Sequence, residues 1–137
     1  MRYRLRHFAL VILLFSVSTP IAAQTPKHGD RKPPVNPCHS KGVALTRPFT
    51  KAFPAYGFLA ALPSLDKEAD SSDAPKQSKL ILCENGKELG PAHGVHAEIG
   101  QIGTGKYSHW TKIGIIFSAS DNSDPNVNGR TYKAVMP

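Results

Sequence analysis

The 137-residue sequence lacks long apolar runs, internal repeats and nucleotide-binding motifs. Its apolar stretch Phe8–Val17 is well short of the roughly 20 residues that cross a bilayer, which disfavours an uncleaved membrane anchor. Heptads, a phosphate-binding glycine loop and a dinucleotide-binding fingerprint are also absent from the sequence. Coiled coils, repeat arrays and nucleotide-dependent enzymes are therefore poor interpretations of this chain.

The N-terminal segment has the charge order of a secretory signal peptide. Three Arg precede the short apolar stretch, and small residues follow it up to Ala22 and Ala23. We therefore expect residues 1–23 to be a signal peptide, with Gln24 as the new N-terminus and a periplasmic or secreted location. No Cys stands at the expected cleavage point, which disfavours a lipid-anchored form.

The basic charge of the chain is concentrated near the N-terminus of the mature protein. Between residues 24 and 53, six Lys and Arg face one acidic residue, whereas residues 54–137 contain eight basic and nine acidic residues. Residues 24–37 are rich in Pro, so we expect a disordered basic linker before a single domain at 38–137. A folded basic face for nucleic acid is not indicated, although the arm could weakly attract anionic envelope polymers.

Only two Cys are present, Cys38 and Cys83. In an oxidising compartment they allow one intramolecular pairing, so we expect a disulfide that joins the end of the arm to the strand containing Cys83. Two buried free thiols are the alternative.

Short apolar runs separated by turn residues predict strands throughout the domain. The clearest signal is a hairpin in which Leu80–Cys83 and Lys87–Leu89 flank Asn85-Gly86, a dipeptide that tolerates positive φ at both turn positions. Further strands are expected at Tyr56–Leu62, Ile113–Phe117 and Arg130–Met136, and one helical turn is expected at Leu65–Ala69 within the polar loop Ser64–Ser78. Val95–Ile102 is ambiguous: alternation of Val95, Ala97 and Ile99 favours a strand, and Gly100 and Gly103 disfavour a long helix, so we count it as a strand. About six short strands predict an all-β fold, either a small antiparallel sandwich or a partly open barrel.

Three His lie within seventeen residues, at His93, His96 and His109. Imidazole is the usual zinc ligand, so a zinc site is one interpretation, and hydrogen-bonded structural histidines are the other. A nucleophilic triad would need one of Ser118, Ser120 or Ser123 with a His and an Asp, but no nucleophile elbow is present. We therefore expect no catalytic residues and no required cofactor, with zinc as a candidate ion.

The segment SDNSDPNVNGRTY, residues 120–132, has three interpretations. Asp124, Asn126 and Asn128 followed by Gly129 match the first half of an EF-hand calcium loop, but Val135 replaces the Glu that closes such a loop. Saccharide contacts are the second interpretation. The third is a strand connection in which Asp and Asn side chains bind their own backbone.

The stretch from Leu82 to Tyr132 resembles an accessory block of bacterial cell-surface polysaccharide glycosyltransferase- and methyltransferase-type proteins. The shared motifs are ENG, LGPAH with a second His, YSHW, and an FS-SDNSDP-NGR-Y segment. The resemblance implies a role with glycans. This chain carries the block without a catalytic domain, which favours binding over transfer.

We therefore expect a secreted, non-catalytic binding module that contacts cell-envelope glycans through the loops around Trp110 and residues 120–130. Aromatic rings offer flat faces for a pyranose, and amide, carboxylate and guanidinium groups bind hydroxyls. The expected ligand-binding residues are Tyr107, Trp110, Asp121, Asn122, Asn128 and Arg130. The alternatives are a zinc hydrolase using His93, His96 and His109, and a purely structural domain in which Arg130 pairs with Asp121 or Asp124.

Overall fold

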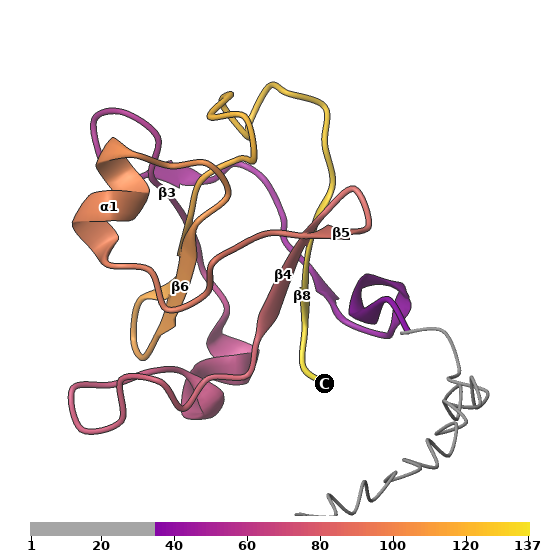
Figure 1. Cartoon of the computed structure of the whole chain (residues 1–137), viewed down its shortest axis with the longest axis vertical. Helices are drawn as coiled ribbons and strands as arrows, with labels where there is room; N and C mark the ends of the chain where they lie inside the picture. The colour runs from indigo at the N-terminus through magenta and orange to yellow at the C-terminus, as the bar shows by residue number, and fades with distance from the viewer. Residues whose placement is uncertain (1–34) are drawn as a thin grey trace, which may run out of the picture. The chain divides into compact units, whose positions relative to one another are not determined.

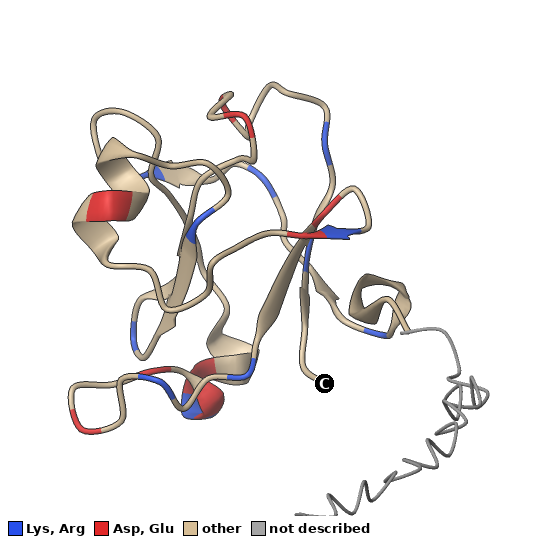
Figure 2. Cartoon of the chain, in the orientation of Figure 1, with Lys and Arg blue, Asp and Glu red and all other residues tan. Residues whose placement is uncertain are grey.

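A computed structural model of the chain describes residues 35–137. The predicted signal peptide and residues 24–34 of the predicted linker lie outside the described residues. No helix within residues 35–137 is long and apolar enough to cross a membrane. Within residues 35–137, both basic and acidic residues occur in several parts of the ribbon (Figure 2).

Within the described residues, eight short strands form two antiparallel four-stranded sheets, which confirms the predicted all-β fold (Figure 1). The first sheet has the order β1-β8-β4-β5 and the second has the order β2-β3-β7-β6. The strands are β1 (Val43–Ala44), β2 (Thr50–Lys51), β3 (Phe58–Ala60), β4 (Ile81–Glu84), β5 (Lys87–Glu88), β6 (Tyr107–Trp110), β7 (Gly114–Phe117) and β8 (Tyr132–Val135). The helices are the 3-10 helices η1 (Pro37–His39) and η2 (Pro63–Glu68) and the α-helix α1 (His96–Gln101).

The larger of two hydrophobic clusters within residues 35–137 contains side chains from both sheets. Three aromatic rings, those of Phe49, Phe117 and Tyr132, meet there with centroids 5.0–5.7 Å apart, and the two contacts of Phe49 are edge to face. Such pairs contribute about 0.5–1.5 kcal/mol each beyond the area they bury. As the alternation in the last strand predicts, Tyr132 and Ala134 are buried in this core and Met136 packs against it.

The predicted hairpin is confirmed as β4 and β5. Asn85 and Gly86 form its turn, with φ values of 49° and 78°, the left-handed backbone that this dipeptide tolerates. The predicted strand at Ile113–Phe117 is also confirmed, because β7 is buried along its whole length.

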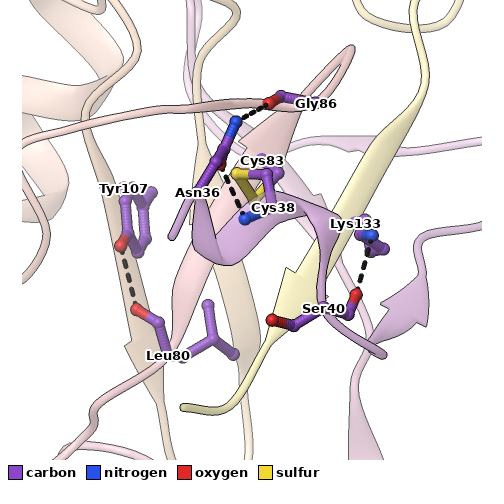
Figure 3. Close-up of a disulfide and its surroundings, with 8 residues drawn as sticks. All are labelled: Asn36, Cys38, Ser40, Leu80, Cys83, Gly86, Tyr107 and Lys133. Atoms are coloured by element: carbon purple, nitrogen blue, oxygen red, sulfur yellow. Dashed lines mark hydrogen bonds between the residues drawn. A yellow bond between two sulfur atoms is a disulfide. The ribbon is translucent and has the colours of Figure 1, made fainter. Parts of the chain in front are cut away.

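The expected disulfide joins Cys38 of η1 to Cys83 of β4 (Figure 3). Asn36 holds η1 in place with two side-chain hydrogen bonds: its Oδ1 accepts from Cys38 N–H at 2.9 Å, and its Nδ2 donates to Gly86 O at 3.1 Å. Val135 and Ile81 pack on the buried disulfide. The first folded turn is thus fixed to the hairpin both covalently and by polar contacts.

The prediction of a strand at Val95–Ile102 is wrong, because residues His96–Gln101 of this segment form the helix α1. The apparent alternation does not follow burial: Val95 and Ala97 are exposed, and only Ile99 of the three is buried. Gly100 packs against Phe53 so closely that an added Cβ would lie 2.5 Å from the Phe53 Cβ. Gly103 ends the helix with φ 70°, in the position where helices commonly use a left-handed residue.

Candidate functional site

Two of the residues predicted to bind one glycan, Tyr107 and Trp110, lie at opposite ends of the β6–β7 hairpin. Trp110 pairs with Gly114 at the turn, whereas Tyr107 pairs with Phe117 at the end from which residues 118–131 emerge. Tyr107 is also buried, and its hydroxyl donates to Leu80 O at 2.9 Å (Figure 3). Burial raises the pKa of Tyr107. A single site containing all six predicted residues is therefore not formed.

Arg130 stabilises the loop between β7 and β8, residues 118–131, through ion pairs with Asp121 and Glu84. Its guanidinium donates to both carboxylate oxygens of Asp121, at 2.9 and 2.5 Å, and to Glu84 Oε2 at 3.2 Å. Of the two partners suggested by the sequence, Asp121 is the one that Arg130 contacts. Hydrogen bonds from Ser123 and then from Arg130 lower the pKa of Asp121, and the bonds to Asp121 and Glu84 raise the pKa of Arg130.

Glu84 is the buried centre of this network. Burial alone would raise its pKa, but hydrogen bonds from Ser120, Tyr132 and Arg130 outweigh burial, so the pKa of Glu84 is lowered. Tyr132 donates to Glu84 Oε1 at 2.9 Å. Burial next to this carboxylate raises the pKa of Tyr132 to about 12. The side chains of Ser120, Arg130 and Tyr132 thus all use hydrogen bonds to Glu84 inside the protein.

The Asn side chains of the loop bind the protein's own backbone. Asn126 accepts from Phe49 N–H at 2.7 Å and donates to Phe49 O at 3.0 Å. Asn122 accepts from Thr104 N–H at 2.5 Å and donates to Ile102 O at 3.0 Å. Asn128 accepts from Arg130 N–H at 3.1 Å and donates to Tyr132 and Ser123.

Each of the three predicted calcium ligands has a side-chain oxygen that already accepts a backbone hydrogen bond. Asp124 Oδ1 accepts from Asn126 N–H at 2.8 Å, as in an Asx turn. Among residues 35–137 no group of three or more His, Cys, Asp or Glu is placed to hold a metal ion. The geometry of residues 120–132 instead agrees with the structural interpretation, a connection whose side chains satisfy its backbone.

Each of the three predicted zinc ligands contacts a different side chain. His93 Nδ1 lies 2.6 Å from Asp70 Oδ2, His109 Nδ1 lies 2.8 Å from Ser78 Oγ, and His96 Nε2 lies 3.3 Å from Ser108 Oγ. The proposed triad serines bond elsewhere: Ser118 with Gly105 N–H, Ser120 with Glu84 and Ser123 with Asp121. Neither a zinc site nor a triad of the predicted composition is assembled in the described part of the chain.

Two of these histidines, His93 and His96, nevertheless line one pocket of about 440 Å³. It lies between the start of α1, strand β6 and the segment at residues 70–76. The His96 and Trp110 rings meet edge to face in its wall, with centroids 5.7 Å apart. Burial lowers the pKa of His96, which favours its neutral form. The lining residues are Asp70, Pro75, Lys76, His93, Gly94, Val95, His96, Ala97, Ser108 and Trp110.

Asp70 enters the pocket because its backbone joins the edge of the second sheet. Its N–H donates to His109 O and its carbonyl accepts from Thr111 N–H, both at 2.9 Å, which makes a parallel bridge with Trp110. The sequence interpretation placed this residue in a polar loop, and no periodic pattern marks it. A backbone bridge of one residue leaves little signal in the sequence.

His93 is placed by the backbone between Pro91 and Gly94. It adopts φ 55°, an uncommon left-handed conformation in which His is enriched among non-glycine residues. Gly94 N–H donates to Tyr107 O at 2.8 Å, so the segment is fixed to β6. An added Cβ at Gly94 would lie 3.0 Å from Ile99 Cγ1, which shows how closely the segment packs on α1.

Two further pockets contain fewer polar side chains that are free to bind a ligand. One of about 390 Å³ contains Asp66, whose carboxylate already accepts from Thr111 Oγ1 and Lys112 N–H. The other, of about 410 Å³, runs past β1 and β3 and contains no charged side chain. The pocket beside Trp110 is therefore the strongest candidate site.

Comparison of this chain with protein-family models, with curated proteins and with solved structures found no match.

Proposed function

We propose that this chain is a secreted or periplasmic, non-catalytic saccharide-binding module whose pocket beside Trp110 holds one sugar ring. The observation that carries the proposal is the combination in this pocket of a half-buried indole with imidazole, hydroxyl and ammonium groups. Its volume of about 440 Å³ falls in the range of about 300–1,000 Å³ typical of small-molecule sites.

A pyranose suits the chemistry of these walls. The C–H face of the ring can pack on Trp110, where burial of apolar surface contributes most. Its hydroxyls can bond to His93, Ser108 and Lys76, which all line the pocket. Residues 120–130, in contrast, serve to hold the fold in this proposal, because their polar groups are bonded internally.

The resemblance to the polysaccharide-associated block supports the same site. His93 belongs to its LGPAH motif, His96 is its second His, and Ser108 and Trp110 belong to YSHW. All four line the pocket, although they come from separate segments of the chain. The proposed export is supported by the charge order of residues 1–23 and by the Cys38–Cys83 disulfide, which suits an oxidising compartment.

The test is retention on immobilised bacterial envelope polysaccharide, measured with the purified chain. Trp110→Ala should abolish retention while the thermal midpoint of unfolding falls by only a few degrees. Asp121→Asn, at the other end of the hairpin, is the matched control and should keep retention. A large fall in midpoint without loss of retention would instead favour the purely structural interpretation.

Hydrolysis is a second candidate function, favoured by the imidazole of His93, which a buried carboxylate orients as in a general base. Its zinc-dependent form lacks a ligand set within the described residues. Turnover of p-nitrophenyl acetate that disappears in His93→Ala would favour it, and a rate equal to that of the buffer would exclude that ester activity.

A further inference from the structure

Both carboxylate oxygens of Asp70 have partners inside the protein. Asp70 is 1% exposed, its Oδ1 accepts from Ser78 N–H at 2.8 Å, and its Oδ2 lies 2.6 Å from His93 Nδ1. An ionised carboxylate is only an acceptor, so the proton in the second contact belongs to His93 Nδ1. The carboxylate therefore decides which ring nitrogen of His93 carries hydrogen.

The other ring nitrogen is left for the pocket. A neutral imidazole with its proton on Nδ1 has a lone pair on Nε2 and accepts a hydrogen bond there. His93 lines the pocket with 27% of its side chain exposed, and no protein group within residues 35–137 bonds to its Nε2. The ring turns its Nδ1 edge to buried Asp70 and leaves its Nε2 edge to a ligand.

A second layer fixes the direction of the carboxylate. Ser78, whose N–H binds Asp70, is buried, and its hydroxyl lies 2.8 Å from Nδ1 of buried His109 and accepts from Leu80 N–H at 3.3 Å. The donor to Oδ1 is the backbone N–H of Ser78, which can only donate and can never accept a hydrogen bond. Asp70 is consequently held in one orientation from behind.

We propose that Asp70 is a positioning residue which makes His93 a hydrogen-bond acceptor, and that the pocket selects a neutral pyranose donating one hydroxyl to His93 Nε2. This inference rests on the proposed saccharide function and names the ligand class: a sugar with an apolar face against Trp110 and a donating hydroxyl at the ring edge. Ser108 and Lys76 remain for its other oxygens.

Asp70→Asn should reverse the proton position without changing the shape. Ser78 N–H needs an acceptor, so the amide oxygen takes the place of Oδ1 and the amide NH₂ faces His93 Nδ1. His93 must then accept at Nδ1 and carry its proton on Nε2. The pocket would present a donor where the native protein presents an acceptor.

The first experiment reads the tautomer by ¹⁵N NMR of histidine-labelled protein at pH 8, above the ordinary pKa of imidazole. The native chain should show His93 protonated on Nδ1, Asp70→Asn should show it protonated on Nε2, and the nearby Asp73→Asn control should match the native chain. His93→Gln assigns the signals. A native His93 protonated on Nε2, or no change in Asp70→Asn, would overturn the proposal.

The second experiment measures binding of neutral pyranosides and of their acidic uronic counterparts by calorimetry. For the best neutral sugar, replacing one hydroxyl by fluorine, which accepts but cannot donate, should weaken binding about tenfold. Asp70→Asn should lose that discrimination while its thermal midpoint stays close to the native one. Preference for acidic sugars, or tolerance of fluorine at every position, would overturn this inference and leave the saccharide function standing. Binding of none of the sugars would overturn the saccharide function itself.

Discussion

Asp70 and Trp110 are neighbours through their backbones, in a bridge of one residue that extends the second sheet beside β6. The bridge places a carboxylate and an indole in the wall of one pocket although forty residues separate them in sequence. Their side chains need no mutual contact to be positioned, because the sheet edge fixes both.

Asp70→Ala should lower the free energy of unfolding by roughly 1–3 kcal/mol, because Ser78 N–H would be buried without its acceptor. His93 adds less to this cost, since its part-exposed ring can bind water. Urea unfolding of the variant measures the change, with Asp73→Ala, at an exposed residue three positions further along the chain, as the control. Equal stability of the two variants would contradict the role given to the Asp70 carboxylate.

Replacing both Cys38 and Cys83 by Ala should destabilise the chain by about 4 kcal/mol, since the disulfide closes a loop across a separation of 45 residues. Native protein in reducing agent should show a similar loss. Denaturant midpoints with and without reductant check this. An unchanged midpoint would mean that the contacts of Asn36 suffice to hold η1.

Glu84→Gln should flatten the acid dependence of stability. The pKa of Glu84 is lowered in the folded protein, where hydrogen bonds outweigh burial, so its contribution is present above its ordinary pKa of 4.5 and is lost as pH falls below that value. Unfolding free energies between pH 7 and pH 3 measure the slope. Glu88→Gln on exposed β5 is the charge-matched comparison, and identical slopes for the two variants would refute the prediction.

Gly100→Ala should destabilise α1 although alanine is the better helix former. The new methyl would overlap Phe53, and overpacking of this kind typically costs about 1–3 kcal/mol. In a Phe53→Gly background, which removes the Cβ together with the ring, the same substitution should cost much less. Chemical unfolding of the four proteins gives the coupling between the two sites; additive effects would show that Phe53 is not the obstacle.

Asn126→Ala should loosen the loop at residues 120–130, because Phe49 N–H and Phe49 O both lose a partner. We expect a loss of roughly 1–3 kcal/mol, from hydrogen bonds that are partly buried. Addition of calcium should leave the thermal midpoints of the native chain and the variant unchanged. A rise in the native midpoint with calcium that Asn126→Ala removes would restore the calcium interpretation.

The sequence predicts those parts of the fold whose signals are local. Asn85-Gly86 specifies its hairpin through backbone preference, and the run at Ile113–Phe117 is too short for a core helix. The two Cys allow one pairing only. Alternation of Tyr132 and Ala134 reflects a strand with one face in the core.

Long-range contacts decide the parts that the sequence did not predict. Gly100 disfavours a helix by its intrinsic propensity, but α1 requires a glycine at this position because Phe53 packs directly against its backbone. Strands β1 and β2 have two residues each, too few for any periodicity. The sequence predicts that the residues near Trp110 and those near Arg130 form one binding site, but the length of the four-residue strand β6 separates the two groups. The Asp70 partner of His93 comes from a loop that no pattern marks.

The position of β8 in the first sheet has a consequence for how the chain folds. Tyr132–Val135 pairs with β1 on one side and with β4 on the other, so neither of those strands has its central neighbour until this segment has been synthesised. Nascent chains shorter than this lack a central strand of the first sheet and the core side chains of Tyr132 and Ala134. Folding then depends on contacts between distant segments, a topology associated with slow assembly and a need for protection of the unfolded chain before it is complete.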